Sequence, residues 1–249
     1  MVGIVFDIET TGLNVGEDRI IEIAAREATK GVDRSYASLV NPRCPIPESA
    51  TQIHGIDDPM VEKSPLFGDV IPEFIDFCGT DTVFLIAHNG NRFDIPFLKA
   101  EFSRCGMDIP PAWKWIDTLD WSKRFRSDLP GFSLQALRET YRIPSNQAHR
   151  ALDDVDVLTQ LIHKMWDDLA PADVYGVLSA LPTRMTFGKY KGKELKHVPD
   201  SYFAWLEREG AFEKEENAAL KQALREQGRL MSKREDSQKN DRIRWNRNV

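Results

Sequence analysis

Two carboxylates near the start of the chain, Asp7 and Glu9, are the first candidates for chemistry. They follow an apolar run, Gly3 to Phe6, that predicts a buried strand. Residues two apart on an extended chain project to the same side, so both carboxylates should point into one place. Crowded like charges are unfavourable unless a cation neutralises them, and hard oxygen ligands suit Mg²⁺ or Mn²⁺. The alternative is a pair of solvated carboxylates at a strand end.

A third carboxylate, Asp94, follows the second unbroken apolar run of the sequence. Residues 83–87 predict another buried strand, and the loop after it ends in Asp94. Ligand sites of open α/β sheets gather at strand ends, so Asp94 is expected near Asp7 and Glu9. The alternative is that Asp94 caps the helix predicted for residues 95–105.

A histidine and a fourth carboxylate flank the start of a later helix. Val155, Leu158 and Ile162 recur at helical spacing, with His149 at or just before the first turn and Asp154 one to two turns into the helix. A surface histidine and acidic residues that favour the helix dipole are the alternative. Four carboxylates and one histidine, each at the end of an element, together favour a shared metal site.

The elements that must position these residues are those of an α/β domain. Apolar alternation predicts strands over residues 21–25 and 35–40, and the turn at residues 31–33 favours consecutive antiparallel strands. Helical spacing of apolar residues between positions 67 and 78 predicts a helix that faces the core.

Three segments of this chain resemble the exonuclease motifs of the DEDD superfamily. They are residues 7–13 (DIETTGL), residues 88–94 (HNGNRFD) and residues 149–154 (HRALDD). The spacing of His149 and Asp154 is that of the histidine-bearing branch, DEDDh, which includes DnaQ-like proofreading subunits, RNase T and oligoribonuclease. The resemblance covers about residues 1–170. It implies an α/β, ribonuclease H-like mixed sheet, with its first three strands antiparallel, flanked by helices.

The resemblance also implies an activity and a set of roles. The expected enzyme is a metal-dependent 3′-to-5′ exonuclease that releases nucleoside 5′-monophosphates from DNA 3′ ends, using two Mg²⁺ ions that Mn²⁺ can replace. His149 would act as the general base. The implied metal ligands are Asp7, Glu9, Asp94 and Asp154. The implied substrate-binding residues are Thr10, Thr11, Gly12, Leu13, His54, Asn89 and Phe93. For Phe93, packing into the core is an equal alternative.

The remainder of the chain predicts a connecting segment at 171–182, a small module at 183–227 and a basic, disordered tail at 228–249. The module contains the patterns FGKY at residues 187–190 and YFAWL at residues 202–206. In these patterns it resembles a module that follows the nuclease domain in bacterial exonuclease X. Residues 185–193 predict a hairpin or tight turn in which lysines alternate with Phe187 and Tyr190. Such a mixture suits a single strand of nucleic acid. A compact hairpin with solvated lysines is the alternative.

The composition and charge distribution of the chain indicate its broad class and its location. The chain has 249 residues, of which 41% are hydrophobic and 29% charged, as is typical of soluble globular proteins. Three cysteines without metal-site spacing favour reduced thiols and a cytoplasmic location. Neither a signal peptide nor a membrane span is expected. Residues 1–182 hold 17 basic and 28 acidic residues, whereas residues 228–249 hold 7 and 3, so a polyanion is expected at the tail and metal in the body.

The expected partner is DNA, with single-stranded 3′ ends, and RNA stays open. An exoribonuclease or a polymerase proofreading subunit would use the same chemistry on another substrate or in another assembly. A non-catalytic nucleic-acid-binding scaffold is disfavoured, because such a protein would be expected to have lost a metal carboxylate, and none is missing here. Protein partners, strand preference and oligomeric state cannot be predicted from the sequence.

Overall fold

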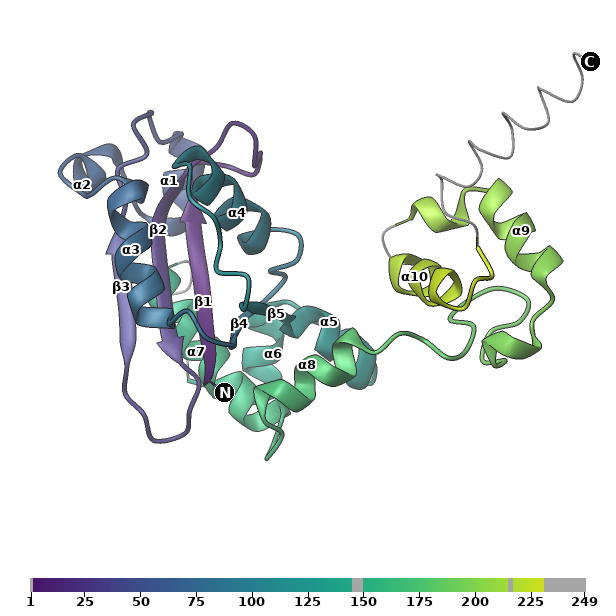
Figure 1. Ribbon diagram of the computed structural model, residues 1–249. Coiled ribbons are helices and arrows are strands. Elements are labelled where there is room, and N and C mark those ends of the chain that lie inside the picture. Colours follow the sequence, from purple (N-terminus) through teal and green to yellow (C-terminus); the bar gives the residue numbers. More distant parts are fainter. Residues whose placement is uncertain (1, 145–149, 215–216, 231–249) are drawn as a thin grey trace, which may run out of the picture. The chain divides into compact units, whose positions relative to one another are not determined.

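The computed structural model describes residues 2–144, 150–214 and 217–230 (Figure 1). The chain divides into two compact units, Met1–Leu178 and Ser179–Val249. Each unit has a hydrophobic core of its own. The finer division, with a connecting segment at 171–182 and a tail from residue 228, stays a prediction, and residues 231–249 of that tail lie outside the described residues.

The first unit is built on a mixed five-stranded sheet with the order β3-β2-β1-β4-β5. Its strands are β1 (Val2–Thr10), β2 (Ile20–Glu27), β3 (Ser35–Leu39), β4 (Val83–Ala87) and β5 (Lys114–Asp117). β1, β2 and β3 are antiparallel neighbours, whereas β1, β4 and β5 run parallel. The fold predicted from the sequence, with its first three strands antiparallel, is therefore confirmed.

The central strand β1 is longer than the apolar run alone indicates. It extends to Thr10, so Asp7 and Glu9 lie within the strand rather than after it. In register, Asp7 pairs with Ala24 and Glu9 with Glu22 of β2. Because side chains alternate along a strand, all four residues lie on one face of the sheet.

Helices cover both faces of the sheet (Figure 1). The helices of the first unit are α1 (Glu48–His54), α2 (Asp58–Val61), α3 (Phe67–Cys78), α4 (Asp94–Arg104), α5 (Thr118–Phe125), α6 (Leu134–Thr140), α7 (Ala151–Met165) and α8 (Pro171–Ser179). No helix in the described part of the chain has the length and apolar content needed to cross a membrane.

The two faces have different cores. Ile4, Phe6 and Ile8 of β1 share an aromatic-rich core with α3 and α4. Val5, on the opposite face, shares a second core with β4, β5 and α7. Asp7 and Glu9 have the parity of Val5, so they lie on the face that α7 covers.

The second unit is small and mostly helical. Its elements are η1 (Leu195–His197), α9 (Asp200–Arg208), η2 (Ala211–Glu213) and α10 (Ala218–Glu226). Phe203 and Leu224 are fully buried in its core. The predicted turn at residues 185–193 is closed by an antiparallel bridge between Arg184 and Glu194, with Gly188 and Gly192 at positive φ.

Candidate active site

Three carboxylates from two packed elements meet on the α7 face of the sheet. Asp7 and Glu9 project from β1, and Asp154 projects from the first turn of α7. One carboxylate oxygen of each residue lies within 4.8 Å of the others. The packing of α7 on β1 and β2 thus brings together residues almost 150 positions apart in the sequence.

Asp94 lies close to this cluster and is fully enclosed. It is the first residue of α4 and is 2% exposed, with its Oδ1 atom buried and without a hydrogen-bond partner. After burial, the charge of Asp94 is the strongest influence that raises the pKa of Asp7. Asp94 does not cap its helix, because the N-cap position belongs to Phe93 and has no side-chain cap.

The crowding of these carboxylates is evident in their pKa values. Burial, followed by the charges of Asp94 and Glu9, raises the pKa of Asp7 well above its usual range. Burial, followed by the charge of Asp154, raises the pKa of Glu9 to about 8. Burial also raises the pKa of Asp94 to about 7. Burial and the neighbouring charges therefore favour the protonated forms of these groups when no cation is bound.

The donor set fits divalent cations. All four groups offer hard carboxylate oxygens, which suit Mg²⁺ or Mn²⁺. The buried Oδ1 of Asp94 lacks the partner that buried polar atoms require. A bound cation would supply that partner and would offset the repulsion that raises the pKa of Asp7.

A further carboxylate, Glu22, supports the cluster from β2 and was missed by the sequence prediction. It is 4% exposed and lies opposite Glu9 on the neighbouring strand. The Arg150 guanidinium Nη2 donates a hydrogen bond to Glu22 Oε1 at 2.8 Å. The backbone N–H of Ala151 donates to Glu22 Oε2 at 3.0 Å. Glu22 therefore holds the N-terminal end of α7, from which Asp154 projects.

One sequence signal could have identified Glu22. It is the single charged residue in the apolar run Ile20–Ala25, and a charge in a strand buried on both faces needs a partner. The identity of that partner, Arg150, depends on the packing of α7 and could not be predicted from the local sequence. The predicted general base, His149, lies outside the described residues.

The segment that follows β1 forms a loop organised around one aspartate. The Asp18 carboxylate accepts hydrogen bonds from the Thr11 hydroxyl at 3.0 Å and from the Asn14 backbone N–H at 2.8 Å. A Cβ atom added at Gly12 would lie 2.5 Å from this carboxylate, so a larger residue there would displace the Asp18 side chain. The loop leaves Leu13 84% exposed. The side chain of Thr10 is turned inward, and its hydroxyl donates to the Gly12 carbonyl at 2.6 Å.

The loop after β4 is held by a second buried aspartate. The Asp117 carboxylate accepts from the backbone N–H groups of Asn89 and Asn91, both at 3.0 Å, and from that of Leu119 at 2.8 Å. Asn89 has a φ of 65°. Asp117 therefore fixes the backbone that leads from β4 to Asp94.

The other predicted substrate-binding residues, Phe93 and His54, have core contacts. Phe93 is half-buried, and its ring centroid lies 4.9 Å from that of Phe97. His54 is 4% exposed, and its Nδ1 atom accepts the backbone N–H of Ile56 at 3.0 Å. Their roles in substrate binding, like those of Thr10, Thr11, Gly12, Leu13 and Asn89, stay predictions.

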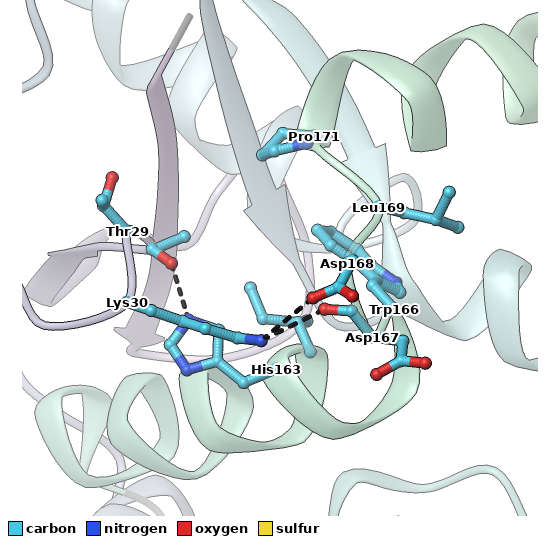
Figure 2. Close-up of a pocket in the computed structure, with 10 residues that line it drawn as sticks. Thr29, Lys30, His163, Trp166, Asp167, Asp168, Leu169 and Pro171 are labelled. Carbon is cyan, nitrogen blue, oxygen red and sulfur yellow. Dashed lines mark hydrogen bonds and ion pairs between the residues drawn. The ribbon is translucent and has the colours of Figure 1, made fainter.

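A separate pocket of about 300 Å³ lies at the opposite end of α7 (Figure 2). Lys30 contacts this end of the helix through the Asp167 carbonyl at 3.3 Å. His163 Nε2 lies 2.6 Å from the Ala28 carbonyl oxygen. Of the residues predicted for catalysis or substrate binding, none of those that the structure describes lines this pocket.

Family models match both parts of the chain. Residues 4–162 match the RNase_T model, described as an exonuclease. Residues 176–224 match a second model, described as a putative quorum-sensing-regulated virulence factor.

Curated relatives resemble the first part of the chain. A PolC-type DNA polymerase III of Caldanaerobacter subterraneus subsp. tengcongensis is 34% identical over 70% of this chain, and exonuclease DPD1 of Arabidopsis thaliana is 38% identical over 67% of it. The chain spans 12% and 56%, respectively, of those two proteins. The DNA polymerase III epsilon subunit of Treponema pallidum is 37% identical over 64% of this chain and is covered over 74% of its own length.

Solved structures share the fold. Exonuclease X in complex with 5′-overhanging duplex DNA superposes with a TM-score of 0.52 and 25% identity, covering 71% of this chain and 99% of that protein. Escherichia coli exonuclease I in complex with a dA16 oligonucleotide has a TM-score of 0.58 and 20% identity, covering 66% of this chain and 41% of that protein. The carboxylate cluster, the mixed sheet and the match over residues 4–162 agree, and the chain belongs to the RNase_T family of DnaQ-like exonucleases.

Proposed function

We propose that the protein is a divalent-metal-dependent 3′-to-5′ exonuclease that removes nucleoside 5′-monophosphates from DNA 3′ ends. The observation that carries this proposal is the meeting of Asp7, Glu9 and Asp154 within 4.8 Å on one face of the sheet. A phosphodiester is an anion, so four carboxylates could approach it only if cations were held between them.

In this proposal, Asp7, Glu9, Asp94 and Asp154 would hold two Mg²⁺ ions, which Mn²⁺ could replace. Bound there, the ions would polarise a water molecule and stabilise the charge that develops on the phosphate oxygens. His149 would accept the proton of the attacking water, a role that histidine side chains commonly take near neutral pH. The exposed Leu13 packs against a terminal base, since no protein contact of its own buries it.

Similarity to exonuclease X bound to DNA supports DNA as the substrate. The experiment compares 5′-labelled single-stranded DNA, duplex DNA and RNA of one sequence, each with Mg²⁺ or with a chelator. A ladder that shortens from the 3′ end, with nucleoside 5′-monophosphates as products, is expected only when metal is present. Faster cleavage of RNA than of DNA would identify the protein as an exoribonuclease. Cleavage in the presence of the chelator would contradict the proposed dependence on a divalent metal.

Polymerase proofreading is a second candidate, supported by the 37% identity to a DNA polymerase III epsilon subunit. A proofreading enzyme should remove a mismatched 3′ nucleotide from a primer–template faster than a matched one. Equal rates on both ends would favour repair or turnover of DNA. The cytoplasmic location expected from the reduced cysteines stays a prediction.

A further inference from the structure

The second unit carries three neighbouring aromatic rings, of which Trp205 is exposed and Tyr190 and Tyr202 are half-buried. Tyr202 and Trp205 are three residues apart on α9 and therefore share a face of the helix. Their rings stack, with centroids 5.5 Å apart and planes 27° apart. Tyr190 meets Tyr202 edge-on at 4.8 Å. Trp205 is 43% exposed, although tryptophan is usually well buried. We call Tyr190, Tyr202 and Trp205 the aromatic cluster.

The aromatic cluster is held in place by the loop that carries Tyr190. The backbone N–H of Lys189 donates a hydrogen bond to the Tyr202 hydroxyl at 3.1 Å. The loop closes on itself through hydrogen bonds between Met185 and Lys193 and between Gly192 and Met185, both at 2.8 Å. Gly188 has a φ of 73°, and a Cβ atom there would collide with the Tyr202 hydroxyl. The ring positions are therefore fixed before any ligand arrives.

Lysines surround the aromatic cluster. The ammonium nitrogens of Lys189 and Lys193 lie 5.5 and 5.4 Å from the centroid of the Tyr190 ring. Lys191 is exposed between them. Among the residues that the structure describes, these three lysines form no ion pair with a carboxylate. Other cations of the unit do form such pairs, as Arg184 does with Glu194 and Arg229 with Asp200.

The two properties together select a ligand. A purely apolar partner would leave the three ammonium groups without a counter-charge. A simple anion would make no stacking contact with the aromatic rings. A single strand of nucleic acid offers phosphates for the lysines and unpaired base faces for the rings. The acidic first part of the chain, with 28 acidic and 17 basic residues up to position 182, would repel such a polyanion. A positive surface elsewhere in the chain would offset this repulsion.

We propose that the aromatic cluster and Lys189, Lys191 and Lys193 bind single-stranded nucleic acid by base stacking and phosphate contacts. The proposal extends the proposed function, because the bound strand would be the substrate of the first unit. It is tested by binding rather than cleavage, so that the two proposals can fail separately.

The test uses the full chain with Asp7→Asn, which prevents digestion, and a fluorescent dT20 oligonucleotide in chelator. Trp205→Ala should weaken binding by about 5- to 150-fold, the range expected for the loss of one base stack. Since Trp205 is partly exposed, this variant should keep its fold, which circular dichroism checks. The exposed Lys214, which lies over none of the three rings, gives the matched control Lys214→Ala.

The lysines are tested by salt dependence. Each phosphate contact on a single strand contributes about 0.7 to the slope of log affinity against log salt, so Lys189→Ala with Lys193→Ala should reduce the slope by about 1.4. Trp205→Ala should leave the slope unchanged and should have little effect on a 20-base-pair duplex, whose bases are stacked already.

Hydrolysis of thymidine 5′-(p-nitrophenyl phosphate), measured in the same substitutions without Asp7→Asn, should be unchanged, because a mononucleotide ester needs no second binding surface. If the nuclease proposal fails, no version of the chain hydrolyses this ester, yet the binding measurements still stand. Unchanged dT20 affinity in both Trp205→Ala and the double lysine variant would overturn the binding proposal. A protein partner would then be the remaining candidate for this surface. Loss of affinity in the lysine variant alone would overturn the stacking part.

Discussion

The carboxylate of Glu22 accepts a hydrogen bond from the backbone N–H of Ala151 at 3.0 Å. This contact joins the middle of β2 to the first residue of α7. Glu22 also lies opposite Glu9 in the sheet, and Asp154 follows Ala151 within one helical turn. One side chain therefore fixes the distance between two carboxylates that belong to different elements.

Replacement of Glu22 by alanine should impair both stability and activity. Glu22→Ala leaves the Arg150 guanidinium and the Ala151 N–H without their acceptor, which should lower the free energy of unfolding by about 1–3 kcal/mol. We also expect kcat to fall by about 10-fold or more, because Asp154 loses its fixed position. Urea unfolding and steady-state cleavage measure the two effects. Glu22→Gln, which keeps an acceptor oxygen, should recover part of both.

The matched control for Glu22 is Glu17→Gln, an exposed glutamate of the loop after β1. It should change neither quantity. A folded Glu22→Ala variant with full activity would show that α7 keeps its position without this contact.

Asp7→Asn should separate activity from stability. Cleavage should fall by at least about 100-fold, since a central cation ligand is lost and each 1.4 kcal/mol of transition-state stabilisation is worth a factor of ten. In a chelator, however, Tm should rise or stay constant, because an amide cannot ionise, whereas burial and the neighbouring carboxylates already disfavour the ionised form of Asp7. Differential scanning calorimetry measures Tm. The exposed Asp108→Asn is the control, and a large fall in Tm for Asp7→Asn would contradict this account.

The stability of the metal-free protein should depend on pH in an unusual direction. The folded-state pKa of Glu9 is raised from 4.5 to about 8, and that of Asp94 from 3.8 to about 7. The folded state therefore binds more protons than the unfolded state between these values, so the free energy of unfolding should fall as pH rises from about 4 to about 8.

Unfolding by urea at several pH values in a chelator measures this slope. A saturating divalent ion should flatten it, because cation binding favours the ionised carboxylates. Glu9→Gln should flatten it in part without metal. A stability that increases with pH over this range would show that the carboxylates are less crowded than their positions indicate.

Leu13→Ala tests the predicted contact with a terminal base. Leu13 is 84% exposed, so its truncation should change the free energy of unfolding by no more than about 0.5 kcal/mol. If the side chain packs against a base, KM for an oligonucleotide should rise several-fold. The exposed Ile53→Ala is a control for loss of an apolar surface group. An unchanged KM would assign Leu13 no role in binding.

The elements that carry the carboxylates could be predicted because the local sequence specifies them, whereas the mixed sheet and the meeting of Asp154 with Asp7 and Glu9 were implied by the resemblance to the DEDD motifs. Apolar runs marked β1 and β4, and the two-residue spacing of Asp7 and Glu9 set their common side. The apolar period of residues 155–162 marked α7 and hence the helix that carries Asp154. Such patterns need no knowledge of which elements touch.

Contacts between distant elements were beyond local patterns. The partner of Glu22 depends on the packing of α7 on β2, and the loop around Asp18 depends on which N–H groups turn inward. The length of β1 was underestimated because carboxylates are unusual in a buried strand. The burial of His54 was likewise not legible in the local sequence, and its role in substrate binding stays a prediction.

The alternation along β1 has a consequence for how the chain finds its native pairing. A slip of one residue would turn Asp7 and Glu9 away from α7 and into the layer of phenylalanines beneath α3 and α4. Bare carboxylates in an apolar layer are strongly disfavoured. Asp7 and Glu9 destabilise the native sheet through their mutual repulsion, but they would destabilise the shifted register more. The two carboxylates therefore favour the native register of β1 over the shifted one.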